Sequence, residues 1–244
     1  MLVKQKVKYI QSLGQKKFRE QEGLFIAEGP KIIKELLETG TANIKELYAV
    51  KGWNIENKEL LNKTEVVEIT EIELEKISQL ITPNKVVAVV RQFNPDAKIT
   101  IKDKITLALD AIQDPGNFGT IIRIADWFGI NQIVCGNGCA EIYNPKVVQA
   151  TMGSIARVKI IYTDLSGWLS QQKGITIYAA MLEGTNVTKM SPVKEGLIII
   201  GNEAKGIQEE LLQFVNEKIT IPKRGNADSL NAAVATGIIL SHIV

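Results

Sequence analysis

Residues 221–235, with the sequence IPKRGNADSLNAAVA, decide how the C-terminal half of the chain is organised. An uncharged apolar run ends there at a proline, and Gly225 can adopt backbone angles that are closed to other residues, which predicts the end of a strand. Asp228 or Ser229 can then cap a helix that begins at about Leu230 and continues to the end of the chain. We interpret this strand, loop and helix as the floor of an active site.

The predicted terminal helix is apolar on almost every side. No Asp, Glu, Lys or Arg occurs between Ser229 and Val244, and the apolar side chains are not confined to one stripe of the helical wheel. Such a helix must be covered on several sides. The rest of the domain could supply that cover, but the pattern also suits a subunit interface, and we favour a homodimer.

The composition is that of an ordinary globular protein whose core is large enough for one or two domains. Of the 244 residues, 45% are hydrophobic and 23% are charged. Two cysteines, Cys135 and Cys139, are too few for a disulfide framework, and the single histidine, His242, leaves no credible zinc site. The longest apolar runs are far shorter than the roughly 20 residues that a membrane span needs. We therefore expect a cytoplasmic protein without a targeting signal, a membrane span or a metal.

Positive charges are concentrated at the N-terminus, although the net charge is only +2. Residues 1–19 contain no acid, and their cations are Lys4, Lys6, Lys8, Lys16, Lys17 and Arg19. A cluster of this kind can bind the phosphates of a nucleic acid. From the charges alone, a solvated helix face is the alternative.

The pattern of apolar runs predicts two α/β domains, over residues 1–97 and 98–244, with a polar, proline-broken linker near residues 94–103. The smaller first domain begins with a basic helix over residues 3–20. The second domain alternates strands and helices more regularly, which implies a mostly parallel sheet. Its strands are predicted at residues 105–112, 132–135, 158–162, 176–182, 197–200 and 218–221.

Three loops that follow strands of the second domain combine glycine with polar side chains. They are residues 114–119 (DPGNFG), 201–206 (GNEAKG) and 222–231 (PKRGNADSLN). Because ligands bind beyond the carboxyl ends of the strands in a parallel sheet, these loops are expected to meet at one edge. None of them fits the GxGxxG or GxxxxGK[ST] motif of common nucleotide-binding sites. Taken singly, each loop could be no more than a strand-to-helix turn.

The helix after the first loop carries one arginine away from its apolar side. Phe118, Ile121, Ile122 and Ala125 form the face that is expected to be buried. At about 100° per residue, Arg123 points roughly 140° away from the centre of that face. It can therefore face a ligand, although a solubilising arginine would show the same spacing.

Together, the three loops resemble the signature motifs of the SpoU/TrmH family of RNA ribose 2′-O-methyltransferases, which belongs to the SPOUT superfamily. The three motifs occur in the family's order at residues 114–125, 200–207 and 221–235. The first half of the chain resembles the family's SpoU-type substrate-binding domain through Arg19 and residues 25–29 (FIAEG).

The resemblance implies transfer of a methyl group from S-adenosylmethionine to a ribose 2′-hydroxyl of structured RNA, and we favour ribosomal RNA. It also implies a deep trefoil knot at the C-terminus, with the cofactor held among the three C-terminal loops. The residues expected to bind the cofactor are Met181, Leu182, Gly201, Asn202, Gly206, Ile221, Ser229 and Leu230. Two alternatives are the same reaction on transfer RNA, and an RNA-binding or assembly protein that keeps the fold without catalysis.

By the same resemblance, the catalytic residues are Asn117, Arg123, Glu203, Ser229 and Asn231. A guanidinium keeps its proton in proteins, so Arg123 is expected to grip an RNA phosphate or to steady the developing alkoxide, with help from Asn117. Glu203 either orients Arg123 or shapes its own loop. Ser229 and Asn231 match the third motif, although either could simply cap the last helix. No residue stands out as the general base.

Overall fold

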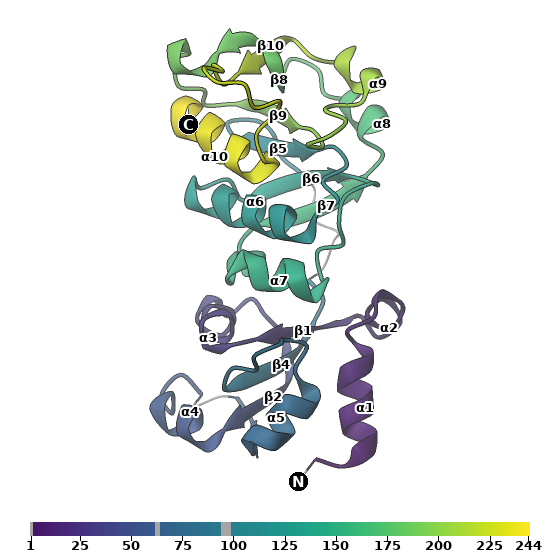
Figure 1. Ribbon diagram of the computed structural model, residues 1–244, viewed down its shortest axis with the longest axis vertical. Helices are drawn as coiled ribbons and strands as arrows, with labels where there is room; N and C mark the ends of the chain where they lie inside the picture. The colour runs from purple at the N-terminus through teal and green to yellow at the C-terminus, as the bar shows by residue number, and fades with distance from the viewer. Residues whose placement is uncertain (1, 62–63, 94–98) are drawn as a thin grey trace. The chain divides into compact units, whose positions relative to one another are not determined.

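The structure, a computed structural model, describes residues 2–61, 64–93 and 99–244 (Figure 1). Contacts divide the chain into two compact units. The first contains Met1–Asn94 and Glu141–Ala156, and the second contains Pro95–Ala140 and Arg157–Val244. The predicted domain boundary at residues 97 and 98 lies outside the described residues. Residues 141–156, which the sequence assigns to the second domain, belong by their contacts to the first unit.

The first unit is built on a mixed sheet with the strand order β1-β4-β2-β3. Its strands are β1 (Leu24–Glu28), β2 (Ile44–Val50), β3 (Val66–Ile69) and β4 (Val86–Arg91). The strands are antiparallel where β4 meets β1 and β2, and parallel where β2 meets β3. Residues 86–90 of the central strand β4 are all buried, as expected for β-branched side chains that are covered on both faces.

Short helices accompany this sheet. They are α1 (Lys4–Ser12), α2 (Lys16–Glu22), α3 (Pro30–Thr39), α4 (Lys51–Glu56), α5 (Glu71–Ile77), α7 (Pro145–Thr151) and the 3-10 helix η1 (Ser154–Ala156). Helix α3 buries Ile32, Ile33 and Leu36, as its apolar spacing predicts. Both α3 and α7 pack against β1. Helix α4 has few of the residues that signal a helix and is not predicted from the sequence.

The predicted single helix over residues 3–20 is divided into α1 and α2. At the break, a Cβ atom on Gly14 would lie only 2.3 Å from the Gln79 side chain, so the chain passes close to another segment there. The guanidinium of Arg19 donates to the carbonyl oxygens of Leu13 at 3.0 Å and Gly14 at 2.8 Å. These bonds satisfy carbonyl groups that the end of α1 leaves free.

The second unit contains a parallel sheet with the strand order β10-β8-β9-β5-β6-β7. Its strands are β5 (Ile105–Leu109), β6 (Gln132–Gly136), β7 (Lys159–Thr163), β8 (Ile177–Asn186), β9 (Gly196–Ile200) and β10 (Glu217–Thr220). Its helices are α6 (Pro115–Trp127), α8 (Leu165–Leu169), η2 (Val187–Lys189), α9 (Glu209–Leu212) and α10 (Ala232–Ile243). The predicted α/β architecture with a mostly parallel sheet is confirmed.

The pairing of β8 with β10 is interrupted. Lys218 pairs with Ala179, but the next residue, Ile219, pairs with Thr185, so residues 180–184 of β8 have no partner in β10. A Cβ atom at Gly184 would lie 2.3 Å from the carbonyl oxygen of Lys218, so only glycine permits this approach.

The terminal helix α10 begins later than the sequence predicts. Asn231 is its N-cap, because its side-chain oxygen accepts from the backbone N–H of Ala233 at 3.0 Å and of Val234 at 3.2 Å. Asp228 and Ser229 lie in the preceding loop, so Asn231 is the one that caps the helix among the three possible caps in the sequence. Asn231 can bond two free amides of the first turn, and this fixes the start of the helix. Helix α10 packs against α6.

Candidate functional site

The first loop is fixed by a helix cap. Asp114 is the N-cap of α6, and its carboxylate accepts from the backbone N–H of Asn117 at 2.7 Å. Pro115 occupies the first helical position, where no intrahelical N–H is needed. Because Phe118 and Ile121 are fully buried, the helix is held on its apolar face, and the half-buried Asn117 lies in its first turn.

Side chains from all three loops meet at Asn117. Its amide nitrogen donates to the carboxylate of Glu203, and its amide oxygen accepts from Nδ2 of Asn231 at 2.7 Å. The two bonds fix the orientation of the Asn117 amide, since a carboxylate can only accept and Asn231 here donates. Glu203 lies 86 positions and Asn231 lies 114 positions after Asn117 in the chain, yet both bind its side chain.

The second loop is closed on itself by Asn202. Its backbone exchanges two hydrogen bonds with Gly206, at 3.0 and 2.8 Å. Its side-chain oxygen accepts from the backbone N–H of Ala204 and Lys205, and its amide donates to the carbonyl oxygen of Ala111 at 2.9 Å. Asn202 therefore shapes its own loop and ties it to the segment between β5 and the first loop.

Glycine is required in this loop. A Cβ atom on Gly201 would lie 2.5 Å from the carbonyl carbon of Gly206, and Gly206 itself has φ +69°. Any other side chain at Gly201 would separate the two ends of the turn, and Gly206 occupies the left-handed region that glycine favours. The tight turn brings backbone N–H and C=O groups to the edge of the sheet.

Asp110 is a further link that the sequence analysis misses. It is 1% exposed at the end of β5, and its carboxylate accepts from the backbone N–H of Gln208 at 2.7 Å and from Nε2 at 2.5 Å. A buried carboxylate with both oxygens bonded anchors the end of the second loop to β5. In the sequence, Asp110 is only a single acid directly after an apolar strand. That pattern is too common to identify a site residue.

A cavity of about 880 Å³ opens beside this network. Its wall includes the unpaired residues 180–184 of β8, the second loop and the third loop. Every residue predicted to bind the cofactor lines it: Met181, Leu182, Gly201, Asn202, Gly206, Ile221, Ser229 and Leu230. Glu203 also lines it. Lining residues outside the predicted cofactor-binding set include Glu183, Gly184, Lys205, Thr220, Lys223, Arg224 and Asp228.

The predicted catalytic residues divide into two groups. Asn117, Glu203 and Asn231 are joined by hydrogen bonds, and Ser229 is exposed on the cavity wall. Arg123 is exposed on α6, as its helical position predicts, and forms no hydrogen bond or ion pair with the described residues. The Glu203 carboxylate contacts Asn117 and not Arg123, so it joins the second loop to the first.

Comparisons with known proteins point to one family. Residues 104–241 match the SpoU rRNA Methylase family, and residues 4–88 match the MRM3-like substrate binding domain. The chain is 30% identical over 242 residues to the 23S rRNA (guanosine(2553)-2′-O)-methyltransferase RlmP of Bacillus subtilis, covering 98% of this chain and 96% of the relative. The chain belongs to the SpoU rRNA methylase family. This confirms the family predicted from the three motifs.

Solved SpoU-family structures agree over nearly the whole chain. The AdoMet-bound rRNA methyltransferase from Sinorhizobium meliloti is 31% identical, with a TM-score of 0.84, and the match covers 99% of this chain and 95% of that one. The SpoU methyltransferase AviRb from Streptomyces viridochromogenes, in complex with AdoMet, is 25% identical, with a TM-score of 0.82. That match covers 97% of this chain and 96% of AviRb.

The prediction that Arg19 contacts RNA is contradicted by its burial. Its side chain is only 2% exposed, and its guanidinium forms an ion pair with Glu141. The physical reason is that the turn between α1 and α2 needs its donors, as the bonds to Leu13 and Gly14 show. Arg19 is therefore a structural residue of the first unit.

The N-terminal lysines are not equivalent. Lys6 pairs with Glu46 at 2.8 Å and lies 5.3 Å from the centre of the Tyr9 ring. Lys16 pairs with Glu20 at 3.5 Å, one helical turn away. The other three lysines of the predicted RNA surface, Lys4, Lys8 and Lys17, are exposed and form no ion pair with the described residues.

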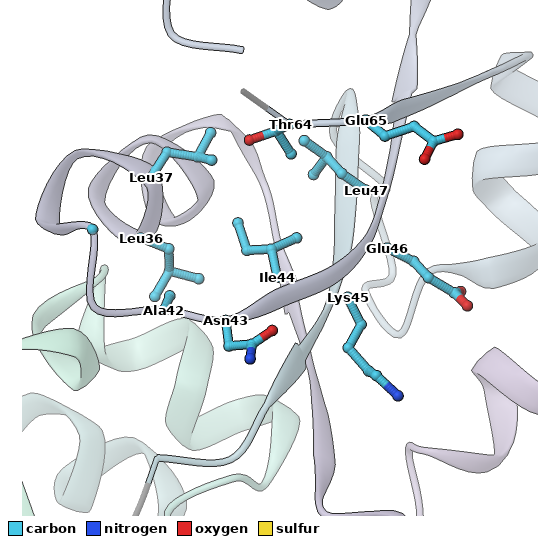
Figure 2. A pocket seen from close by; sticks show the side chains of 11 residues that line it. Leu36, Leu37, Ala42, Asn43, Ile44, Lys45, Glu46, Leu47, Thr64 and Glu65 are labelled. Carbon is cyan, nitrogen blue, oxygen red and sulfur yellow. The ribbon is translucent and has the colours of Figure 1, made fainter. Parts of the chain in front are cut away.

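A second cavity, of about 380 Å³, lies in the first unit beside the end of α3 and the start of β2. Figure 2 shows the apolar side chains of Leu36, Leu37 and Ile44 gathered on one side of it, while Lys45 extends away. None of the predicted site residues lines this cavity.

Metal and membrane signals are lacking in the described part of the chain. Over residues 2–61, 64–93 and 99–244, no group of three His, Cys, Asp or Glu could hold a metal ion. The same residues include no helix that is long and apolar enough to cross a membrane.

Proposed function

We propose that this protein transfers a methyl group from S-adenosylmethionine to a ribose 2′-hydroxyl of ribosomal RNA. The observation that carries the proposal is the meeting of Asn117, Glu203 and Asn231 beside the cavity that the predicted cofactor residues line. Relatives that match nearly the whole chain are named as methyltransferases of 23S rRNA, which supports rRNA as the substrate class.

The cavity suits the cofactor. Its volume of about 880 Å³ falls within the range of roughly 300–1,000 Å³ that is typical of small-molecule sites. Leu182, Ile221 and Leu230 provide apolar surface for an adenine ring, while Glu183 and Asp228 could face the cationic groups. The tight glycine turn at residues 201–206 would offer backbone N–H and C=O groups for hydrogen bonds.

The roles of the chain's own residues follow from this geometry. Bound S-adenosylmethionine supplies an electrophilic methyl group on a sulfonium centre. We assign Arg123 to hold an RNA phosphate or to stabilise the negative charge that develops on the ribose oxygen, because a guanidinium stays charged and pairs well with oxyanions. Asn117, held by Glu203 and Asn231, would position the ribose near Arg123, and Ser229 would contact the ligands from the cavity wall.

A C-terminal trefoil knot belongs to the same proposal. Strand β10 lies at the sheet edge beyond β8, whereas α10, which follows it, packs against α6. The chain after β10 must therefore cross back past β8 and β9, which supports a knotted C-terminal segment. The cavity is lined by both sides of this crossing, since residues 201–206 and 222–230 contribute to it.

We further propose that the protein is a homodimer, and that residues 1–97 recruit RNA to a catalytic domain over residues 98–244. Large apolar side chains support the dimer: Trp127 is 86%, Val234 51% and Leu230 45% exposed. Sedimentation equilibrium should give a dimer for the natural chain and a monomer for the W127K/V234K variant. A monomeric natural chain would refute this part of the proposal.

The test of activity is a transfer assay with the purified protein, radiolabelled S-adenosylmethionine and RNA from cells that lack this protein. Label is expected in the ribosomal RNA fraction and at a ribose, as ribose-methylation mapping would show. Label in the transfer RNA fraction alone would instead select the transfer RNA alternative. Failure to bind S-adenosylmethionine in calorimetry would favour the non-catalytic alternative.

A further inference from the structure

Three exposed cations line the large cavity. Lys205 lies in the second loop, and Lys223 and Arg224 lie in the third; all three line the cavity and are exposed. None of them forms an ion pair with the residues that the structure describes. A fourth cation, Lys218 in β10, also lines the wall.

The backbone that carries these cations is fixed, although their side chains are free. The backbone N–H of Lys205 donates to the Asn202 side chain at 3.1 Å. Thr220 lies shortly before Lys223 and Arg224 in the chain. Its hydroxyl donates to the carbonyl oxygen of Leu182 at 2.9 Å, which ties the end of β10 to β8. Pro222 then restricts the backbone directly before Lys223. Hydrogen bonds therefore hold the backbone at Lys205 itself and at Thr220, a few residues before Lys223 and Arg224.

The cofactor does not account for these charges. S-adenosylmethionine carries a sulfonium, an ammonium and a single carboxylate, so it can neutralise one cation at most. Like charges around one cavity repel one another unless an anion binds between them. The lining acids, Glu183, Glu203 and Asp228, are fewer than the four lining cations. The surplus cations match a polyanion, and RNA carries one phosphate per nucleotide.

We propose that Lys205, Lys223 and Arg224 form a phosphate-binding rim that holds the RNA backbone on either side of the ribose to be methylated. The inference rests on the proposed function and adds the residues that position its substrate. Lysine acts as a point charge toward a phosphate, and the guanidinium of Arg224 can bind two of its oxygens. The rim is separate from the N-terminal lysines, which lie in the first unit.

The experiment compares the natural chain with the K205A/K223A/R224A variant. The first measurement is the affinity for a short, fluorescent, single-stranded RNA of mixed sequence across a range of salt concentrations. Removing three cations that bind single-strand phosphates should lower the slope of log K against log salt by about 0.7 for each cation, and should weaken binding by about tenfold or more at low salt. The K205R/K223R variant should retain most of the affinity.

A charge-matched control is the K159A/K189A/K194A variant. These three exposed lysines belong to the second unit but do not line the cavity. The control should keep the salt slope of the natural chain. Calorimetry with S-adenosylmethionine should give the same affinity, within about twofold, for the natural chain and the rim variant. A rim variant whose cofactor affinity falls while its RNA salt slope is unchanged would overturn the proposal.

Activity separates this inference from the proposed function. With ribosomal RNA as acceptor, the rim variant should show a raised KM and a kcat close to that of the natural chain, because the rim binds RNA without entering the chemistry. If the natural chain methylates no RNA but the rim variant loses salt dependence, the proposed function fails and the rim stands. If the natural chain is active and the salt slope is unchanged, the rim fails alone.

Discussion

Arg19 and Arg123 are both predicted to meet RNA, yet the two regions that hold them use an arginine differently. In the turn between α1 and α2, Arg19 is 2% exposed, binds two carbonyl groups and pairs with Glu141. On α6, Arg123 is exposed and has no partner among the described residues. The guanidinium of Arg19 is bound by groups of its own unit, whereas that of Arg123 is available to a ligand. The same residue type is thus part of the packing in one unit and exposed to solvent in the other.

The largest effect expected from this comparison is on stability, in the R19A variant. Removing one member of a largely buried ion pair leaves the other charge without compensation, which costs about 3–5 kcal/mol. Chemical denaturation of the full chain, followed by circular dichroism, should show this loss. The K6A variant removes the more exposed pair with Glu46 and should cost no more than about 1 kcal/mol. If R19A and K6A lose the same free energy of unfolding, Arg19 does not have this structural role.

The second expected effect is on catalysis, in the R123A variant. Loss of one preorganised group that stabilises developing charge lowers kcat by about 10²–10³-fold. Because Arg123 is exposed, the melting temperature should stay within about 2 °C of that of the natural chain. Single-turnover methyl transfer and calorimetry with the cofactor would measure both properties. A large loss of stability in R123A would mean that Arg123, like Arg19, stabilises the fold.

A third effect separates the two bonds that Asn231 makes. The N231D variant keeps a side-chain oxygen to cap α10 but cannot donate to Oδ1 of Asn117, whereas N231A loses both bonds. We expect N231A to lose about 1 kcal/mol of stability through the cap, and N231D to keep that stability. Both variants should transfer methyl groups about fivefold more slowly, because a hydrogen bond worth about 1 kcal/mol no longer orients Asn117. Full activity in N231D would make Asn231 a helix cap only.

Local patterns predict much of this molecule, because strands and helices follow the spacing of apolar residues. The motif loops were predictable as loops, and the parallel sheet implied that they would share an edge. The order β10-β8-β9-β5-β6-β7 was not predictable, since it depends on pairing between distant segments. The cap of α10 was also ambiguous, because Asp228, Ser229 and Asn231 are all good caps.

The site shows the same division between local and distant information. The bonds of Asn117 to Glu203 and Asn231 join residues that no local pattern connects, so only the family motifs placed them in one site. The bonds between Asp110 and Gln208 lie outside those motifs and were missed. The burial of Arg19 depends on Glu141, a residue 122 positions away that the sequence assigned to the other domain.

The smallest expected effect tests whether the remaining N-terminal cations behave like Arg123 or like Arg19. The K4A/K8A/K17A variant removes lysines that form no ion pair in the described part of the chain, and should reduce the salt slope of RNA binding by about 0.7–0.9 for each phosphate that the variant no longer binds. Lys6 and Lys16 already pair with Glu46 and Glu20. The K6A/K16A variant should therefore change the slope less for each charge removed. Equal slopes for both variants and the natural chain would remove the N-terminal helices from the RNA surface, and would leave the cations of the second unit to account for RNA binding.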